Sequence, residues 1–149
     1  MKLAEALQER ADNSRRIEQL KSRLTDNALI QEGDQPAEDP QELLKELNKC
    51  IKDQTKLIAA INLANASVKA GDKTLTEMLA ERDMLTVQID AYRSLISEAS
   101  TSYQRARNSE IRIISSVNVR ELTKKADQLS KQLRQLENKI QETNWTTEI

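Results

Sequence analysis

The sequence is poor in the residues that most catalytic and ligand-binding sites need. Its 149 residues include no histidine or phenylalanine, one cysteine and two glycines. Without histidine, and with Cys50 at a heptad core position, the chain offers neither a zinc site nor a nucleophile with its base. Gly33 and Gly71 are too far apart to form a phosphate-binding loop. We therefore predict that the protein is not an enzyme and binds no metal or cofactor.

Long hydrophobic runs and an excess charge of one sign are also missing. No stretch approaches the roughly 18 apolar residues of a membrane-spanning helix, and residues 1–10 contain charge too early for a signal peptide. The 23 basic and 24 acidic side chains nearly cancel, so no overall field favours nucleic acid or an anionic membrane as a partner. A lone cysteine is typical of a reducing compartment. These absences predict a cytoplasmic protein.

What the sequence does contain is charge and strong helix formers. Charged residues make up 32% and hydrophobic residues 38% of the chain, with Ala, Glu, Lys, Leu and Arg prominent, as in long helices and coiled coils. So few aromatic rings favour narrow seams between helices over a wide core. We predict an all-α fold in which long antiparallel helical hairpins form a coiled-coil-like bundle, with residues 1–149 as a single domain.

Caps and helix breakers divide the chain into four predicted helices, at about residues 2–30, 41–70, 75–107 and 119–143. The loop at residues 31–40 holds both prolines, and Asp39 at its end is a good N-cap. Thr74 and Glu77 form a capping-box pattern directly after a predicted turn at residues 70–73. Because this turn is short, we expect the second and third helices to pair as an antiparallel hairpin.

The second predicted helix is apolar on more than one side. Its heptad positions run from Leu43 to Val68, and we expect Leu57 and Ile61 among them to be core residues. Three further apolar side chains recur at every seventh residue and widen the stripe: Leu44, Ile51 and Ile58. A stripe this wide contacts more than one neighbour. Leu79 and Leu95 widen the third predicted helix in the same way. The two stripes favour a structural or interaction protein that forms a homo-oligomer and binds a protein partner.

The helical periodicity stops at residues 109–117, where the sequence predicts a short extended segment. No second strand is predicted to pair with it. It is therefore either a crossover over the end of the bundle or an edge that pairs with a second copy of itself. In the second case Ile111 and Ile113 lie at a subunit contact. We also expect the large ring of Trp145 to pack on a neighbouring helix or subunit.

Two charged features differ from the general background. Arg82 falls on a heptad core position beside Asp83, and a charge in an apolar seam needs a partner, so we predict an ion pair that sets helix register. The second feature is a basic cluster near Tyr103 and a predicted helix end: Arg105, Arg107, Arg112, Arg120 and Lys124. Such a cluster suits an anion and provides an alternative function, a nucleic-acid-binding or ribosome-associated factor. More often, acids of a neighbouring helix balance it.

Three segments also resemble a known family. They are QEGDQPAEDP at residues 31–40, the stretch from TLTE to AERD at residues 74–83, and IQETNW at residues 140–145. They resemble small bacterial proteins labelled septicolysin, and the resemblance covers nearly the whole chain. It implies no catalytic residues, marks Arg82, Asp83 and Trp145 as family features, and through the label implies a membrane-active cytolysin as a further alternative.

Overall fold

Four long helices and one very small sheet make up the fold. The computed structural model describes residues 1–101 and 112–149. Its elements, in chain order, are α1 (Leu3–Asp26), α2 (Pro40–Ser67), β1 (Lys69–Ala70), β2 (Lys73–Thr74), α3 (Leu75–Ser100) and α4 (Val119–Thr146). The predicted all-α fold class is confirmed. Within the described residues, no helix is both long and apolar enough to cross a membrane.

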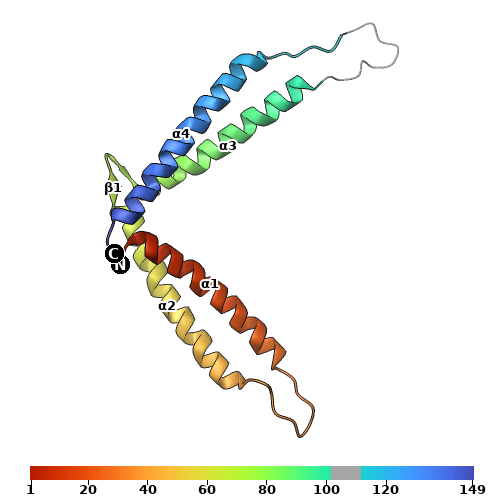
Figure 1. Cartoon of the computed structure of the whole chain (residues 1–149), viewed down its shortest axis with the longest axis vertical. Coiled ribbons are helices and arrows are strands. Elements are labelled where there is room, and N and C mark those ends of the chain that lie inside the picture. Colours follow the sequence, from red (N-terminus) through yellow and green to blue (C-terminus); the bar gives the residue numbers. More distant parts are fainter. Residues whose placement is uncertain (102–111) are drawn as a thin grey trace.

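The helices pair into two arms that meet at a vertex, which gives the molecule the shape of a V (Figure 1). α1 and α2 form one antiparallel arm, and α3 and α4 form the other. α1 and α3 line the opening between the arms, whereas α2 and α4 lie on the outside (Figure 1). The expected hairpin of the second and third helices is wrong, because α2 and α3 belong to different arms and diverge from the vertex.

A β-hairpin at the vertex separates α2 from α3. The strands β1 and β2 are antiparallel, with Lys69 opposite Thr74, and Gly71 between them has a φ of +76°, which glycine adopts without strain. The predicted capping box is present, since the Glu77 amide donates to Thr74 Oγ1 at 3.2 Å and the Thr74 amide donates to Glu77 Oε2 at 2.6 Å. α2 therefore stops at Ser67, short of the predicted residue 70.

The other helix ends also differ from expectation. α1 stops at Asp26 rather than residue 30, because the Asn27 side chain donates to the Arg23 carbonyl at 2.8 Å and accepts from the Glu38 amide at 3.0 Å. α3 stops at Ser100 rather than residue 107, while α4 runs three residues beyond the predicted 143. Residues 112–115 form no strand, and residues 109–111 of the predicted extended segment lie outside the described residues.

The core consists of two apolar clusters. The vertex cluster joins all four helices and contains Leu3, Ala6, Ile61, Ala64, Leu75, Met78 and Ile140. Ile61 is fully buried there, which confirms it as a core residue, whereas Leu57 is only partly buried and packs against the edge of the cluster. A second cluster, of Leu20, Leu43 and Cys50, lies farther along the α1–α2 arm, so Cys50 is buried as its heptad position predicted.

A polar layer lies in the seam between α1 and α2. The Gln54 side chain is buried, and its Nε2 donates to the Arg10 carbonyl and to Ser14 Oγ, both at 2.9 Å. Its Oε1 is buried without a hydrogen-bond partner. Ser14 Oγ also donates to the Arg10 carbonyl, at 2.9 Å. This layer fixes how α1 and α2 align, because a shifted register leaves further buried polar groups unsatisfied.

The two ends of the described chain meet at the vertex. The Leu3 amide donates to the Thr147 carbonyl and the Ile149 amide donates to the Met1 carbonyl, both at 2.9 Å. Lys2 Nζ lies 2.5 Å from Glu148 Oε1. This contact with Lys2, helped by the N-terminal ammonium group, lowers the pKa of the Glu148 carboxyl. The vertex is thus held by a short backbone ladder as well as by its apolar cluster.

Candidate functional site

The predicted Arg82–Asp83 ion pair is present on α3. Arg82 Nε and Nη2 donate to the same oxygen, Asp83 Oδ1, at 3.0 and 2.9 Å. The Arg82 side chain is 37% exposed, so it lies at the edge of the seam rather than inside it. Because both residues belong to one helix, their bond does not itself link two helices. A role for this pair in helix register stays a prediction.

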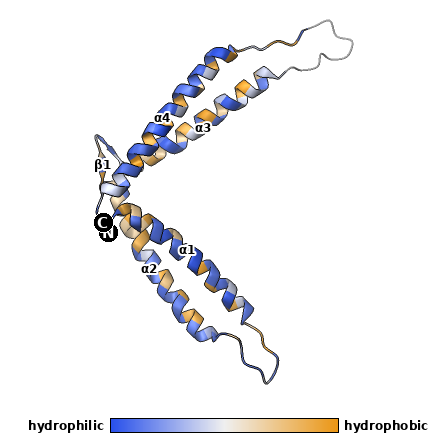
Figure 2. Ribbon diagram, in the orientation of Figure 1, coloured by the Kyte–Doolittle hydropathy of each residue, from blue (hydrophilic) through white to orange (hydrophobic). Residues whose placement is uncertain are grey.

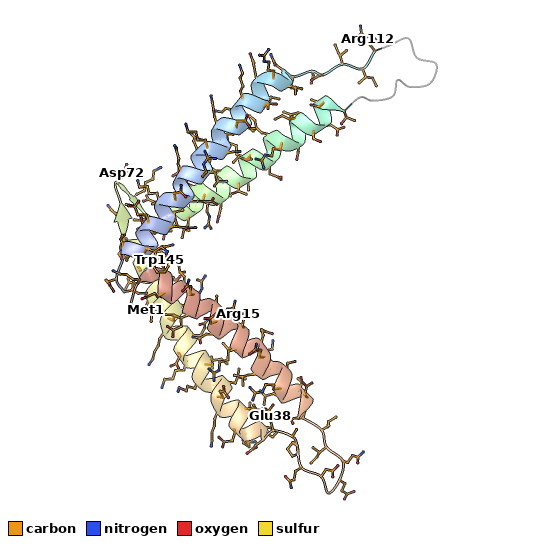
Figure 3. All side chains as sticks on the ribbon, in the orientation of Figure 1. Met1, Arg15, Glu38, Asp72, Arg112 and Trp145 are labelled. Carbon is orange, nitrogen blue, oxygen red and sulfur yellow. The ribbon has the colours of Figure 1, made fainter. Side chains whose placement is uncertain are left out.

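The described members of the predicted basic cluster lie at the end of the α3–α4 arm that is farthest from the vertex. Arg112 is near the tip (Figure 3), and Arg120 and Lys124 are exposed near the start of α4. Arg105 and Arg107 lie outside the described residues. The structure therefore places three of the five basic side chains at one arm end, and their binding of an anion stays a prediction.

The predicted interface residues are exposed where the structure describes them. Ile113 is exposed in the connection that leads to α4, and Ile111 lies outside the described residues. Trp145 lies at the vertex (Figure 3), and 53% of its surface is accessible. The ring is therefore not enclosed by the helices of its own chain. A contact of Ile113 or Trp145 with a second subunit stays a prediction.

The remaining candidates for a ligand site are clustered metal-ligand side chains and the hollow between α3 and α4. Among the described residues, no group of three or more His, Cys, Asp or Glu side chains is placed to hold a metal ion. The hollow between α3 and α4 is lined by charged side chains, including Asp90, Arg93 and Arg134, around a few apolar ones. Arg93 Nη2 donates to Ser130 Oγ there at 3.2 Å.

An apolar stripe runs along the face of α3 that points away from α4. Its residues recur three or four positions apart and are all exposed: Ala80, Met84, Val87, Ala91 and Leu95. Met84 and Val87 are 63% and 59% exposed. By helical periodicity this α3 stripe lies opposite the side that packs on α4. Since α3 is on the inner side of its arm, the stripe faces the opening of the V (Figure 1).

The same helix buries apolar residues on its other side. Leu75, Met78 and Ile89 are buried at the vertex and in the seam with α4. Hydrophobic residues, drawn in orange, therefore recur along α3 toward its far end, whereas α4 is mainly hydrophilic (Figure 2). Carboxylates border the α3 stripe, with Asp83 and Asp90 along one edge. In the sequence, Met84 and Val87 fall outside the heptad positions of this helix, so the heptad pattern did not predict that they form a stripe.

A second exposed stripe lies on α2. Leu44, Ile51 and Ile58 are spaced by seven residues and are each 38% to 45% exposed, beside the seam with α1. This α2 stripe confirms the widening that the sequence predicted. Four lysines lie next to it, on the side of the helix that is farther from the seam with α1: Lys45, Lys49, Lys52 and Lys56. Lys45 pairs with Glu42 at 2.7 Å, and hydrogen bonding to that carboxylate raises the pKa of Lys45.

α1 and α4 have no such stripe. Among the described residues, no large exposed apolar side chain lies on α1, and on α4 there is only Trp145. The exposed apolar side chains are therefore concentrated on α2 and α3, the two helices that the β-hairpin connects. We regard the α2 stripe and the α3 stripe as the candidate functional site.

Comparison with solved structures shows that this fold occurs in a related protein. The chain is similar to a functionally unknown conserved protein from Corynebacterium diphtheriae, with a TM-score of 0.87 and 39% sequence identity. The similarity covers 100% of this chain and 98% of the other chain. Among curated proteins, no match was found.

Comparison with family models corrects the resemblance drawn from the sequence. Residues 10–149 match a model described as a family of unknown function, DUF6847. The expected membership of a septicolysin family is wrong, because this match covers nearly the whole chain and the similar solved structure carries no such label. The cytolysin activity implied by that resemblance loses its only support. The chain belongs to the DUF6847 family.

Proposed function

We propose that this protein is a non-catalytic structural protein that binds partner helices through the α2 stripe and the α3 stripe. The observation that carries the proposal is the α3 stripe. A helix that is apolar on two opposite faces is normally buried on both, yet Met84 and Val87 are largely exposed. Covering one such side chain is worth roughly 1.5–3 kcal/mol. A partner helix laid along the stripe gains several of these contributions at once.

The chemistry of the chain supports a role without catalysis. Its only thiol belongs to Cys50, which is buried in the α1–α2 arm, and it contains no histidine to exchange protons near neutral pH. A lone free cysteine suits the cytoplasm, where thiols stay reduced, and we propose that compartment as the location.

The end of the α3–α4 arm provides a second candidate function. Arg112, Arg120 and Lys124 are exposed there and carry positive charge away from the rest of the molecule. This placement favours contact with phosphates of a nucleic acid. Filter binding at two salt concentrations tests it, because phosphate contacts weaken steeply as salt rises. Binding that is absent at low salt contradicts this second function.

Photocrosslinking tests the proposed binding of helices. A photoreactive amino acid at Val87 should yield covalent adducts with a protein when the chain is expressed in its native cells and irradiated. The matched control places the same amino acid at Gln19, which is exposed on α1 among charged side chains such as Asp12 and Arg15. Adducts that are no more frequent at Val87 than at Gln19 contradict the proposed function.

A further inference from the structure

The chain has far more accessible surface than a compact protein of its mass. Its accessible surface is 11265 Å² for 17.0 kDa, whereas a compact monomer of that mass exposes about 7,700 Å². The excess of about 3,600 Å² in each chain is larger than the roughly 800 Å² that each partner contributes to a standard interface. The two arms therefore provide enough surface for a stable dimer.

The charges around the α3 stripe restrict what can cover it. α3 carries five acidic side chains, Glu77, Glu81, Asp83, Asp90 and Glu98, against two basic ones, Arg82 and Arg93. A second α3 laid on the stripe brings carboxylates against carboxylates, and such like-charge contacts are strongly unfavourable. The stripe instead suits a helix that combines an apolar face with basic flanks.

α2 has this combination. The α2 stripe supplies the apolar face, and four lysines lie on the same helix against three acids, of which Glu42 and Glu46 already pair with Lys45 and Arg16. Lys45 and Lys52 are seven residues apart, as are Asp83 and Asp90 on α3, so one alignment of the two helices brings both pairs together. Within the described residues, Lys52 forms no ion pair in its own chain. α1 and α4 lack an exposed apolar stripe altogether.

We propose that the α3 stripe is covered by the α2 stripe of a second copy of this chain, and that two copies exchange these contacts reciprocally. This proposal rests on the proposed function and names its partner. A two-fold axis then relates two identical contacts, each between the α1–α2 arm of one copy and the α3–α4 arm of the other. Each contact has four helices, as in a four-helix bundle. Because both stripes of both copies are used, the assembly closes at two chains.

Light scattering coupled to size exclusion tests the assembly. The parent chain should have the mass of a dimer at micromolar concentration, and Val87→Glu should have the mass of a monomer with unchanged helical content by circular dichroism. The matched control is Leu29→Glu, which changes a 91% exposed leucine in the loop before α2 and should stay dimeric. A monomeric parent, or a mass that grows beyond two chains, overturns the proposal.

A charge exchange tests which helices meet. One variant carries Lys45→Glu and Lys52→Glu on α2, and the other carries Asp83→Lys and Asp90→Lys on α3. Each variant alone should be monomeric, since both of its contacts oppose like charges. An equal mixture should form a dimer of one chain of each kind, in which both contacts again oppose opposite charges. If the α2 variant alone stays dimeric, or if the mixture stays monomeric, α2 does not cover α3.

The photocrosslinking experiment separates failure of this proposal from failure of the proposed function. An adduct from Val87 to a peptide of the same chain that contains Ile51 supports both. Adducts from Val87 to other proteins alone keep the proposed function and overturn the dimer. An absence of adducts above the Gln19 control overturns both.

Discussion

The two arms are alike in length but differ in how they are held together. In the α1–α2 arm, ion pairs join Arg16 to Glu46 across the helices and Arg23 to Glu38 in the connecting loop. Gln54 adds the polar layer, and Leu20, Leu43 and Cys50 add a second apolar cluster. In the described part of the α3–α4 arm, the cross-helix side-chain hydrogen bond of Arg93 with Ser130 is accompanied by no ion pair between the helices.

The difference shows where the apolar residues of each arm are placed. Beyond the vertex, the buried apolar residues described in the α3–α4 arm are Ile89, Ala126 and Leu129, while Met84, Val87 and Leu95 are exposed. The α3–α4 arm thus uses part of its apolar content on a surface rather than in its own seam. We expect the α1–α2 arm to be stable by itself and the α3–α4 arm to depend more on whatever covers the α3 stripe.

The largest loss of stability is expected from a substitution in the vertex cluster, which both arms share. Ile61→Ala deletes a fully buried side chain in the cluster that joins all four helices, and should lower the free energy of unfolding by about 2–5 kcal/mol. Urea denaturation measures this change. Leu63→Ala is the control on the same helix, where the side chain is 71% exposed and lies outside the α2 stripe, and should cost much less. Equal losses from both changes contradict the assigned core face.

The next prediction sharpens the contrast between the arms. In the Val87→Glu variant the α3 stripe is no longer covered, so amides of α3 beyond the vertex should exchange with solvent faster, by on the order of tenfold, than in the parent chain. Amides around Leu20 in the α1–α2 arm should change little. Hydrogen exchange followed by mass spectrometry of peptides measures both. Equal acceleration in the two arms is inconsistent with an α3–α4 arm that depends on its partner.

The polar layer predicts a gain in stability. Gln54→Leu removes the buried, unpartnered Oε1 from the α1–α2 seam, while Ser14 Oγ still donates to the Arg10 carbonyl. The free energy of unfolding should therefore rise by about 1–2 kcal/mol in urea denaturation. Gln19→Leu on the exposed face of α1 is the control and should have little effect. A loss of stability in Gln54→Leu shows that the layer stabilises the arm as well as aligning it.

The smallest expected effect is a pH dependence of the α1–α2 arm that comes from Glu38. The hydrogen bond from Arg23 lowers the pKa of Glu38 below its ordinary value of 4.5. Its contribution to stability is therefore present above about pH 4.5 and is lost as the pH falls through the lowered pKa. The urea midpoints of the parent and Glu38→Gln should differ at neutral pH and converge in acid. Because the pair is exposed, the difference should be small.

The helices were predictable from the sequence because their signals are local. Asp39 and Thr74 each accept a hydrogen bond from a backbone amide at the start of a helix, as their positions predicted, and Asn118 does the same at the start of α4. The pairing of helices was not predictable in this way. Each helix has an apolar side that faces the core and could pack against several neighbours. The arrangement of the helices depends on a β-hairpin around Gly71, and in the sequence this glycine resembles an ordinary helix end.

The candidate site was predictable in part. Leu44, Ile51 and Ile58 were identified because they extend a heptad seam on one side. The α3 stripe was missed because Met84 and Val87 lie opposite the seam that the periodicity traces. Their role became visible only when α4 was placed on the other side of α3. A helix can be apolar on two sides, and a single heptad pattern describes only one of them.

The angle between the arms at the vertex also sets the distance between their far ends. α3 has 26 residues, so its arm extends about 39 Å from the vertex. A rotation of about 10° at the vertex moves the far end of such an arm by about 7 Å. The packing of Ile61 and Met78 in one small cluster therefore sets the separation of two distant tips. A small change in how these two side chains pack would therefore change the distance between the two arm ends by several ångströms.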